Sequence, residues 1–137
     1  MTEVAGPRRR TDPDEGARAV AAWRADPASA DRASIGTAVR FTLEQLAEVA
    51  PGGTVEVRVP PYAVVQCVEG PRHTRGTPPN VVETDAATWL ALATGSVGWA
   101  EAVAGGRVRA SGGRADLSAY LPLQLGSGTA GPGTVDR

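Results

Sequence analysis

Residues 80–96 read NVVETDAATWLALATGS, and residues 97–123 continue as VGWAEAVAGGRVRASGGRADLSAYLPL. This stretch decides the fold, because its apolar residues change between the two-residue repeat of a strand and the wider repeat of a helix. We expect a strand at 81–84, two short helices separated near Gly95, a strand at 108–111 and a closing helix at 117–121. Strands and helices that alternate in this way predict a mixed α/β fold.

The ends of the two short helices are marked by residues suited to those positions. Asp85 is a good N-cap, because its side chain can accept a hydrogen bond from the first free backbone amides. Gly95 stands where a left-handed C-cap is expected, and Ser96 can cap the second helix. That helix should end at Gly105-Gly106, before a half-exposed strand in which Val108 and Ala110 alternate with two arginines.

Two further helices are expected near the N-terminus. The first begins with Asp12 as cap and Pro13 at the first helical position, and it ends near Asp26-Pro27. The second begins near Ser29 or Asp31 and ends before Pro51-Gly52-Gly53. Its apolar positions follow a helical repeat and predict one face packed on a sheet: Ile35, Val39, Thr42, Leu43, Leu46, Val49 and Ala50.

Two more strands lie between these helices and the stretch quoted above. In segment 54–59 the residues alternate, with Val55, Val57 and Val59 on one side and polar side chains on the other. Segment 62–69 is apolar on both faces, which predicts a central strand. We expect a flexible N-terminus at 1–11, one domain at 12–123 with an extra N-terminal helix at 12–27, and a disordered tail at 124–137.

The composition excludes several classes of protein. The net charge of the 137 residues is −1, so nothing in the overall balance predicts binding to nucleic acid or to an anionic membrane. No apolar run approaches the ~20 residues of a transmembrane helix, and the N-terminus lacks the pattern of a secretion signal. The single cysteine, Cys67, excludes an intramolecular disulfide and fits a reducing compartment, so we expect a cytoplasmic protein.

The loop at 69–80 is the most unusual local sequence. It contains Arg72, the single histidine His73, and Arg75, together with three prolines that stiffen it. Two guanidinium groups and an imidazole can hold a carboxylate or a phosphate. The alternatives are that the arginines pair with Glu69, Glu83 or Asp85 and brace the loop, or that His73 is catalytic.

Catalytic and metal sites are poorly supported by the sequence. There is no nucleophile elbow, and Cys67 in a strand is better explained as a small buried apolar residue than as a partner of His73. One histidine and one cysteine leave too few ligands for zinc. We therefore expect no catalytic residues, no metal and no cofactor.

A set of apolar residues in the second half of the chain has two interpretations. These residues either fill the core or line a cavity between sheet and helices, and both demand inward apolar side chains. The candidates for ligand contact in such a cavity are Trp89, Leu92, Val103, Leu117 and Tyr120.

The order of these features resembles the type two sterol carrier protein superfamily. In that family a helix with the pattern Asp, aromatic, Leu-x-Leu-x-x-Gly precedes a small-residue turn and a basic, alternating strand. The matching residues here are Asp85, Trp89, Leu90, Leu92, Gly95, Ala102, Gly106, Arg107, Val108, Arg109 and Gly112. The chain is also similar to small actinobacterial members of the superfamily and to the C-terminal part of mycothiol-dependent maleylpyruvate isomerases.

The resemblance implies an α/β (α+β) fold with a mixed, curved sheet of about five strands, helices over one face, and an apolar tunnel for lipids. Two functions are compatible with it. The first is a non-enzymatic carrier of a lipid, sterol or acyl ligand, whose anionic end meets the Arg72–Arg75 loop. The second is an accessory or protein-interaction domain that assists a thiol-dependent enzyme. The sequence does not determine the oligomeric state.

Overall fold

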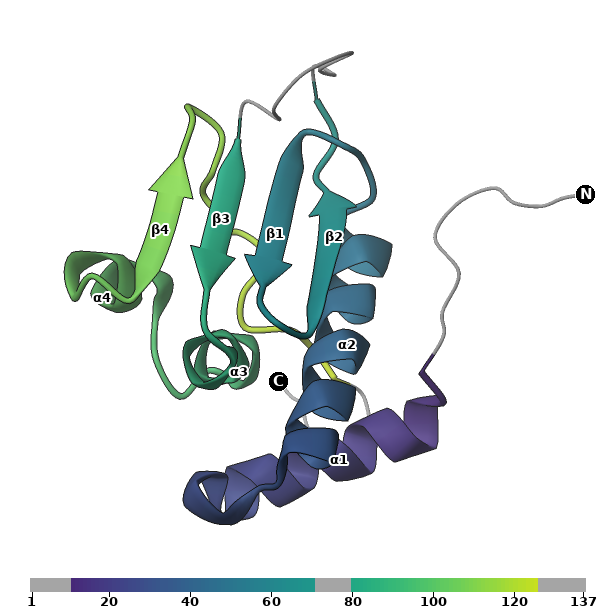
Figure 1. Ribbon diagram of the computed structural model, residues 1–137. Helices are drawn as coiled ribbons and strands as arrows, with labels where there is room; N and C mark the ends of the chain where they lie inside the picture. Colours follow the sequence, from purple (N-terminus) through teal and green to yellow (C-terminus); the bar gives the residue numbers. More distant parts are fainter. Residues whose placement is uncertain (1–10, 71–79, 126–137) are drawn as a thin grey trace, which may run out of the picture.

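Helices and strands alternate along the chain in the computed structural model, which describes residues 11–70 and 80–125 (Figure 1). Their order is α1 (Pro13–Ala25), the 3₁₀ turn η1 (Pro27–Ser29), α2 (Arg32–Val49), β1 (Val55–Val59), β2 (Ala63–Cys67), β3 (Val81–Thr84), α3 (Ala86–Thr94), α4 (Trp99–Ala104) and β4 (Val108–Ser111). The predicted α/β class is therefore confirmed.

The sheet in the described part of the chain has four strands, one fewer than the resemblance implied. Their order is β2-β1-β3-β4, with β1 antiparallel to β2 and parallel to β3, and with β3 antiparallel to β4. The prediction that segment 62–69 is central was wrong, since β2 is an edge strand. Its apolar residues do not all lie in the core, because the surface of Val64 is 56% exposed.

Helix α2 and the segment 112–125 cover one face of the sheet, and the opposite face carries no described helix (Figure 1). Asp31 caps α2 by accepting a hydrogen bond from the backbone amide of Ser34 at 2.7 Å. Most of the predicted apolar stripe of α2 meets the sheet, and Leu46 is completely buried, but Val49 was wrongly included because its surface is 59% exposed. Strand β1 shows the expected alternation, with its three valines buried and its polar residues on the uncovered face.

Helix α1 packs on α2 and crosses its lower part in the view of Figure 1. Asp12 caps it by accepting from the amide of Glu15, and the helix ends before Pro27 as predicted. The two helices approach closely at Gly16, where an added Cβ would come within 2.3 Å of the Phe41 ring. The extra N-terminal helix is therefore fixed to the outside of α2.

Helix α3 joins the sheet to α2. Asp85 caps it through the amide of Thr88 at 2.7 Å, and Gly95 ends it with a φ of 87°. The indole Nε1 of Trp89 donates a 2.8 Å hydrogen bond to the hydroxyl of Thr42, and both side chains are buried. This bond fixes α3 against α2 in the middle of the core.

Two predicted details near these helices were wrong. The cap of α4 is Gly98 and not Ser96, because the amide of Ser96 donates to the carbonyl of Ala91 and closes the end of α3. Residues 117–121 form a turn and not a helix, since so short a segment gains too few helical hydrogen bonds to offset nucleation. Buried Leu117 holds this turn against the core.

None of the helices in the described ranges has the length and apolar character needed to cross a membrane.

Candidate functional site

The predicted apolar contact residues occupy three different environments. Trp89, Leu92 and Leu117 belong to the core between sheet and helices, with exposures of 0–1%. Tyr120 is half-buried and packs against the same core. Val103 lies on the solvent side of α4 with 39% of its surface exposed, so it does not face this apolar layer.

The predicted anion-binding loop cannot be placed with these residues. Arg72, His73 and Arg75 lie outside the residues that the structure describes. Their role in ligand binding stays a prediction from the sequence.

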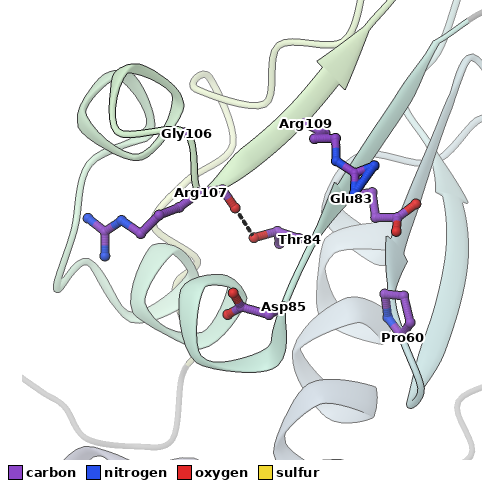
Figure 2. Close-up of a pocket in the computed structure, with 7 residues that line it drawn as sticks. All are labelled: Pro60, Glu83, Thr84, Asp85, Gly106, Arg107 and Arg109. Carbon is purple, nitrogen blue, oxygen red and sulfur yellow. Dashed lines mark hydrogen bonds between the residues drawn. The ribbon is translucent and has the colours of Figure 1, made fainter.

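A pocket of about 400 Å³ lies elsewhere, where β1 and β3 end and β4 begins (Figure 2). It is lined by Pro60, Glu83, Thr84, Asp85, Gly106, Arg107 and Arg109. None of the five described residues that the sequence predicted for ligand contact lines this pocket. Its position fits a general tendency of ligand sites to lie at the carboxyl ends of parallel strands, here β1 and β3.

The register of the sheet brings the charged residues of the pocket together. Glu83 of β3 pairs with Arg109 of β4 on one side and with Arg58 of β1 on the other. Arg107 lies just before β4, two residues before Arg109, and Figure 2 shows the two side chains extending in different directions. The hydroxyl of Thr84 donates a 2.7 Å hydrogen bond to the carbonyl of Arg107, which fixes the backbone at the pocket wall (Figure 2).

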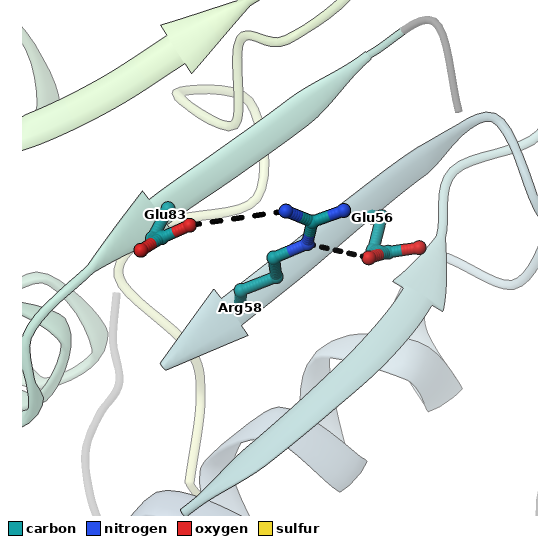
Figure 3. Close-up of polar contacts among 3 residues, drawn as sticks. All are labelled: Glu56, Arg58 and Glu83. Carbon is teal, nitrogen blue, oxygen red and sulfur yellow. Dashed lines mark hydrogen bonds and ion pairs between the residues drawn. The ribbon is translucent and has the colours of Figure 1, made fainter. Parts of the chain in front are cut away.

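A charged cluster on the uncovered face adjoins the pocket (Figure 3). Arg58 Nε lies 2.6 Å from Glu56 Oε2, and Arg58 Nη1 lies 3.9 Å from Glu83 Oε1. The side chain of Glu56 is 14% exposed and that of Glu83 is 33% exposed. Arg58 therefore offsets part of the negative charge of both carboxylates.

Cys67 has no feature of a catalytic nucleophile. The residue is completely buried, and this burial raises the pKa of its thiol to about 11. A thiol with such a pKa stays protonated near neutral pH, whereas the thiolate is the nucleophile. Among the described residues, no group of three or more His, Cys, Asp or Glu side chains is arranged to hold a metal ion.

The sequence indicated that Arg107 and Arg109 are exposed, but it did not reveal the pocket. Glu83 and Arg109 are separated by 25 intervening residues and become neighbours only through the pairing of β3 with β4. The single available signal was the alternation of arginines with Val108 and Ala110, which predicts a strand with one solvent-facing side.

Comparison with known proteins gave one family. The family model described as "Bacterial SCP ortholog" matches residues 31–123, from the N-cap of α2 to Leu123 in the segment that follows β4. The match does not include α1. No curated protein matches the chain.

Proposed function

This chain belongs to the family of bacterial SCP (sterol carrier protein) orthologs, and from this premise we propose that it is a non-enzymatic, carrier-like protein for an apolar or acyl small molecule. The observation that carries the proposal is the extent of the family match. Residues 31–123 include α2, all four strands and α3, which together form both walls of the apolar layer between sheet and helices.

We place the apolar part of the ligand in this layer, beside Trp89, Leu92 and Leu117, with Tyr120 at its border. The segment 112–125 covers the layer without forming a helix or strand of its own. It is fastened by buried Ala115, Leu117 and Leu123. Two hydrogen bonds also hold it, a 2.9 Å bond from the Leu123 amide to the Ala93 carbonyl and a 2.8 Å bond from the Arg114 amide to Asn80 Oδ1. Because few backbone bonds would have to break, movement of this segment is the least costly way to admit a ligand.

The non-enzymatic part of the proposal is supported by the chemistry of the core. Cys67 is a buried, protonated thiol, and Trp89, Leu92 and Leu117 have no acid–base function. The hydroxyl of Thr42 and the indole of Trp89, which are polar groups in this layer, bond to each other. A binding role requires only apolar burial, which stabilises a complex by ~25 cal/mol per Å² of apolar surface.

The test is direct binding by the full chain. Native mass spectrometry of delipidated protein mixed with saturated fatty acids should show a one-to-one complex, and a fluorescent fatty acid should be displaced by the unlabelled acid. Leu92→Ala should shift the preferred acyl length upward, because it removes side-chain volume from the layer. Val49→Ala is the matched control, since Val49 is 59% exposed.

The same binding assay also tests the predicted role of the loop that contains Arg72 and Arg75. Replacing Arg72 and Arg75 together with Gln should weaken acyl binding about tenfold or more, because charge-assisted hydrogen bonds are lost, with a nearly unchanged melting temperature. If no apolar ligand of any length binds the wild-type chain, the carrier function is wrong. A large fall in melting temperature in the double variant would assign both arginines to bracing the loop.

A protein-interaction domain is the second candidate, and the edge strand β2 favours it. Edge strands of soluble proteins commonly carry charges or prolines that prevent pairing with another chain. Strand β2 reads AVVQC, has neither, and leaves Val64 56% exposed. A partner retained by the wild-type chain and lost with Val64→Glu would support this role, and binding that is indifferent to the substitution would remove it.

A further inference from the structure

The pocket at the ends of β1 and β3 has the size and chemistry of a small-molecule site. Its volume of about 400 Å³ lies in the range of ~300–1,000 Å³ that is typical of ligand pockets. Four of its seven lining residues carry a formal charge, namely Glu83, Asp85, Arg107 and Arg109. Its lining includes none of Trp89, Leu92, Leu117 and Tyr120, so it is distinct from the apolar layer proposed above.

The two acids of the pocket already have partners. Glu83 Oε1 lies 3.9 Å from the guanidinium group of Arg58, the residue that pairs with Glu83 across β1 and β3. Asp85 accepts the amide of Thr88 as the N-cap of α3, where the positive end of the helix dipole also offsets its charge. Asp85 is thus balanced without either Arg107 or Arg109, whereas Glu83 shares Arg58 with Glu56 and keeps part of its negative charge.

The two arginines are in the opposite situation. Within residues 11–70 and 80–125, no hydrogen bond or ion pair joins either guanidinium group to another residue. Both residues are exposed, and Arg107 points its guanidinium away from Asp85 (Figure 2). The guanidinium groups of Arg107 and Arg109 therefore line a polar pocket, and their N–H groups can donate hydrogen bonds to a ligand.

We infer that this pocket binds the carboxylate or phosphate group of a small molecule, held between Arg107 and Arg109. A guanidinium group matches both oxyanions, because its parallel N–H donors engage two oxygens at once. Residues two apart in extended chain are separated by ~7 Å, so their long side chains can converge on one doubly charged group or hold two neighbouring ones. Arg107 must swing inward to do so, which an exposed side chain does within nanoseconds.

Backbone features at the pocket wall favour this assignment over a merely exposed pair of arginines. The hydrogen bond from Thr84 to the Arg107 carbonyl ties the start of β4 to the end of β3. Gly106 has a φ of 76° and presents no side chain between α4 and Arg107. The backbone of Arg107 and Arg109 is therefore held in place, while their guanidinium groups can move.

The experiment is a titration of the full-length chain with inorganic phosphate, succinate and decanoate, followed by two-dimensional amide NMR. Saturable shifts should appear at residues 83–85 and 106–109. Arg107→Gln and Arg109→Gln should each raise the dissociation constant about tenfold, as expected for the loss of a charge-assisted hydrogen bond. Arg114→Gln is the matched control, because this exposed arginine lies outside the pocket lining.

The effect of removing the negative charge of Glu83 distinguishes most clearly between an anion site and a structural role. Glu83→Gln should tighten anion binding, because it removes a negative charge from the pocket, whereas a purely structural role of Glu83 would give weaker binding or none. Succinate or phosphate binding that exceeds decanoate binding identifies a free anion, and the reverse identifies an acyl head group; both agree with the inference. Failure of all three probes to saturate, or equal binding by the arginine variants, would overturn it.

The result is independent of the carrier function. If the pocket takes a free anion, Arg107→Gln and Arg109→Gln should leave displacement of a fluorescent fatty acid from the apolar layer unchanged. Conversely, Leu92→Ala should change the preferred acyl length but leave unchanged the amide NMR shifts that phosphate causes at residues 106–109. Such a result would show that the two sites bind their ligands independently.

Discussion

Replacing Thr42 with Val tests whether the buried bond between α2 and α3 stabilises the fold. Both Thr42 and Trp89 are fully buried, and the indole Nε1 donates to the Thr42 hydroxyl at 2.8 Å. Valine has nearly the same shape and helix propensity as threonine, so the change removes the acceptor without opening a cavity. The buried indole N–H then has no partner, which costs ~1–3 kcal/mol.

Two smaller terms adjust this value. The new methyl group gains ~0.8 kcal/mol from apolar burial. The carbonyls of Ala38 and Val39, to which the Thr42 hydroxyl donates, lie inside α2 and keep their helical amide partners. We therefore expect a net loss of roughly 0.2–2 kcal/mol in the free energy of unfolding, measured as a lower urea midpoint at an unchanged slope.

A double-mutant cycle with Trp89→Phe isolates the bond. When Trp89→Phe is already present, the Thr42→Val change should be neutral or stabilising, because no indole N–H remains to be left unpaired. Thr42→Ser is the control, since it keeps the hydroxyl and loses only a methyl group. If Thr42→Val has the same effect with and without the Trp89→Phe substitution, the hydrogen bond contributes nothing and the reasoning is refuted.

Three other predictions concern single residues. Leu46→Ala should lower the free energy of unfolding by about 2–5 kcal/mol in urea titrations, because Leu46 is fully buried on α2; a loss below ~0.5 kcal/mol would contradict its burial. Asp85→Ala should cost about 1 kcal/mol through the lost α3 cap, and Asp85→Asn should recover most of it; equal losses in thermal melts would mean that the cap is unimportant. Cys67 should resist alkylation until the pH approaches its pKa of about 11. Stability should fall as the pH rises from 9.0, the ordinary pKa of the thiol, toward 11, because the unfolded chain releases the thiol proton first; the same slope in Cys67→Ala would assign it to other groups.

Features set by local chemistry were predictable from the sequence. Asp12, Asp31 and Asp85 all cap helices, because an N-cap needs only one side chain and the backbone amides two or three residues later. Gly95 adopts the expected left-handed conformation for a similarly local reason. The burial of alternate valines in β1 follows from the pleat of a single strand.

Features that depend on distant pairing were not predictable in the same way. An apolar run such as segment 62–69 does not reveal whether a second neighbour exists on its far side, and β2 has none in the described sheet. The closing segment 117–121 was predicted to be helical, yet burial of Leu117 and the turn at Tyr120 determine its path. The charged pocket depends on the register of three strands, which no local pattern specifies.

The central position of β1 has a consequence for the order in which the chain assembles. Its antiparallel partner β2 follows after only residues 60–62, whereas its parallel partner β3 is reached after residues 60–80, which include β2. Hairpins close in ~1–10 μs, and pairing across a longer connection is slower because more chain entropy is lost first. The β1–β2 hairpin should therefore form early, and docking of β3 with α3 should complete the folding nucleus. Substitutions in β3 would then slow folding more than they speed unfolding.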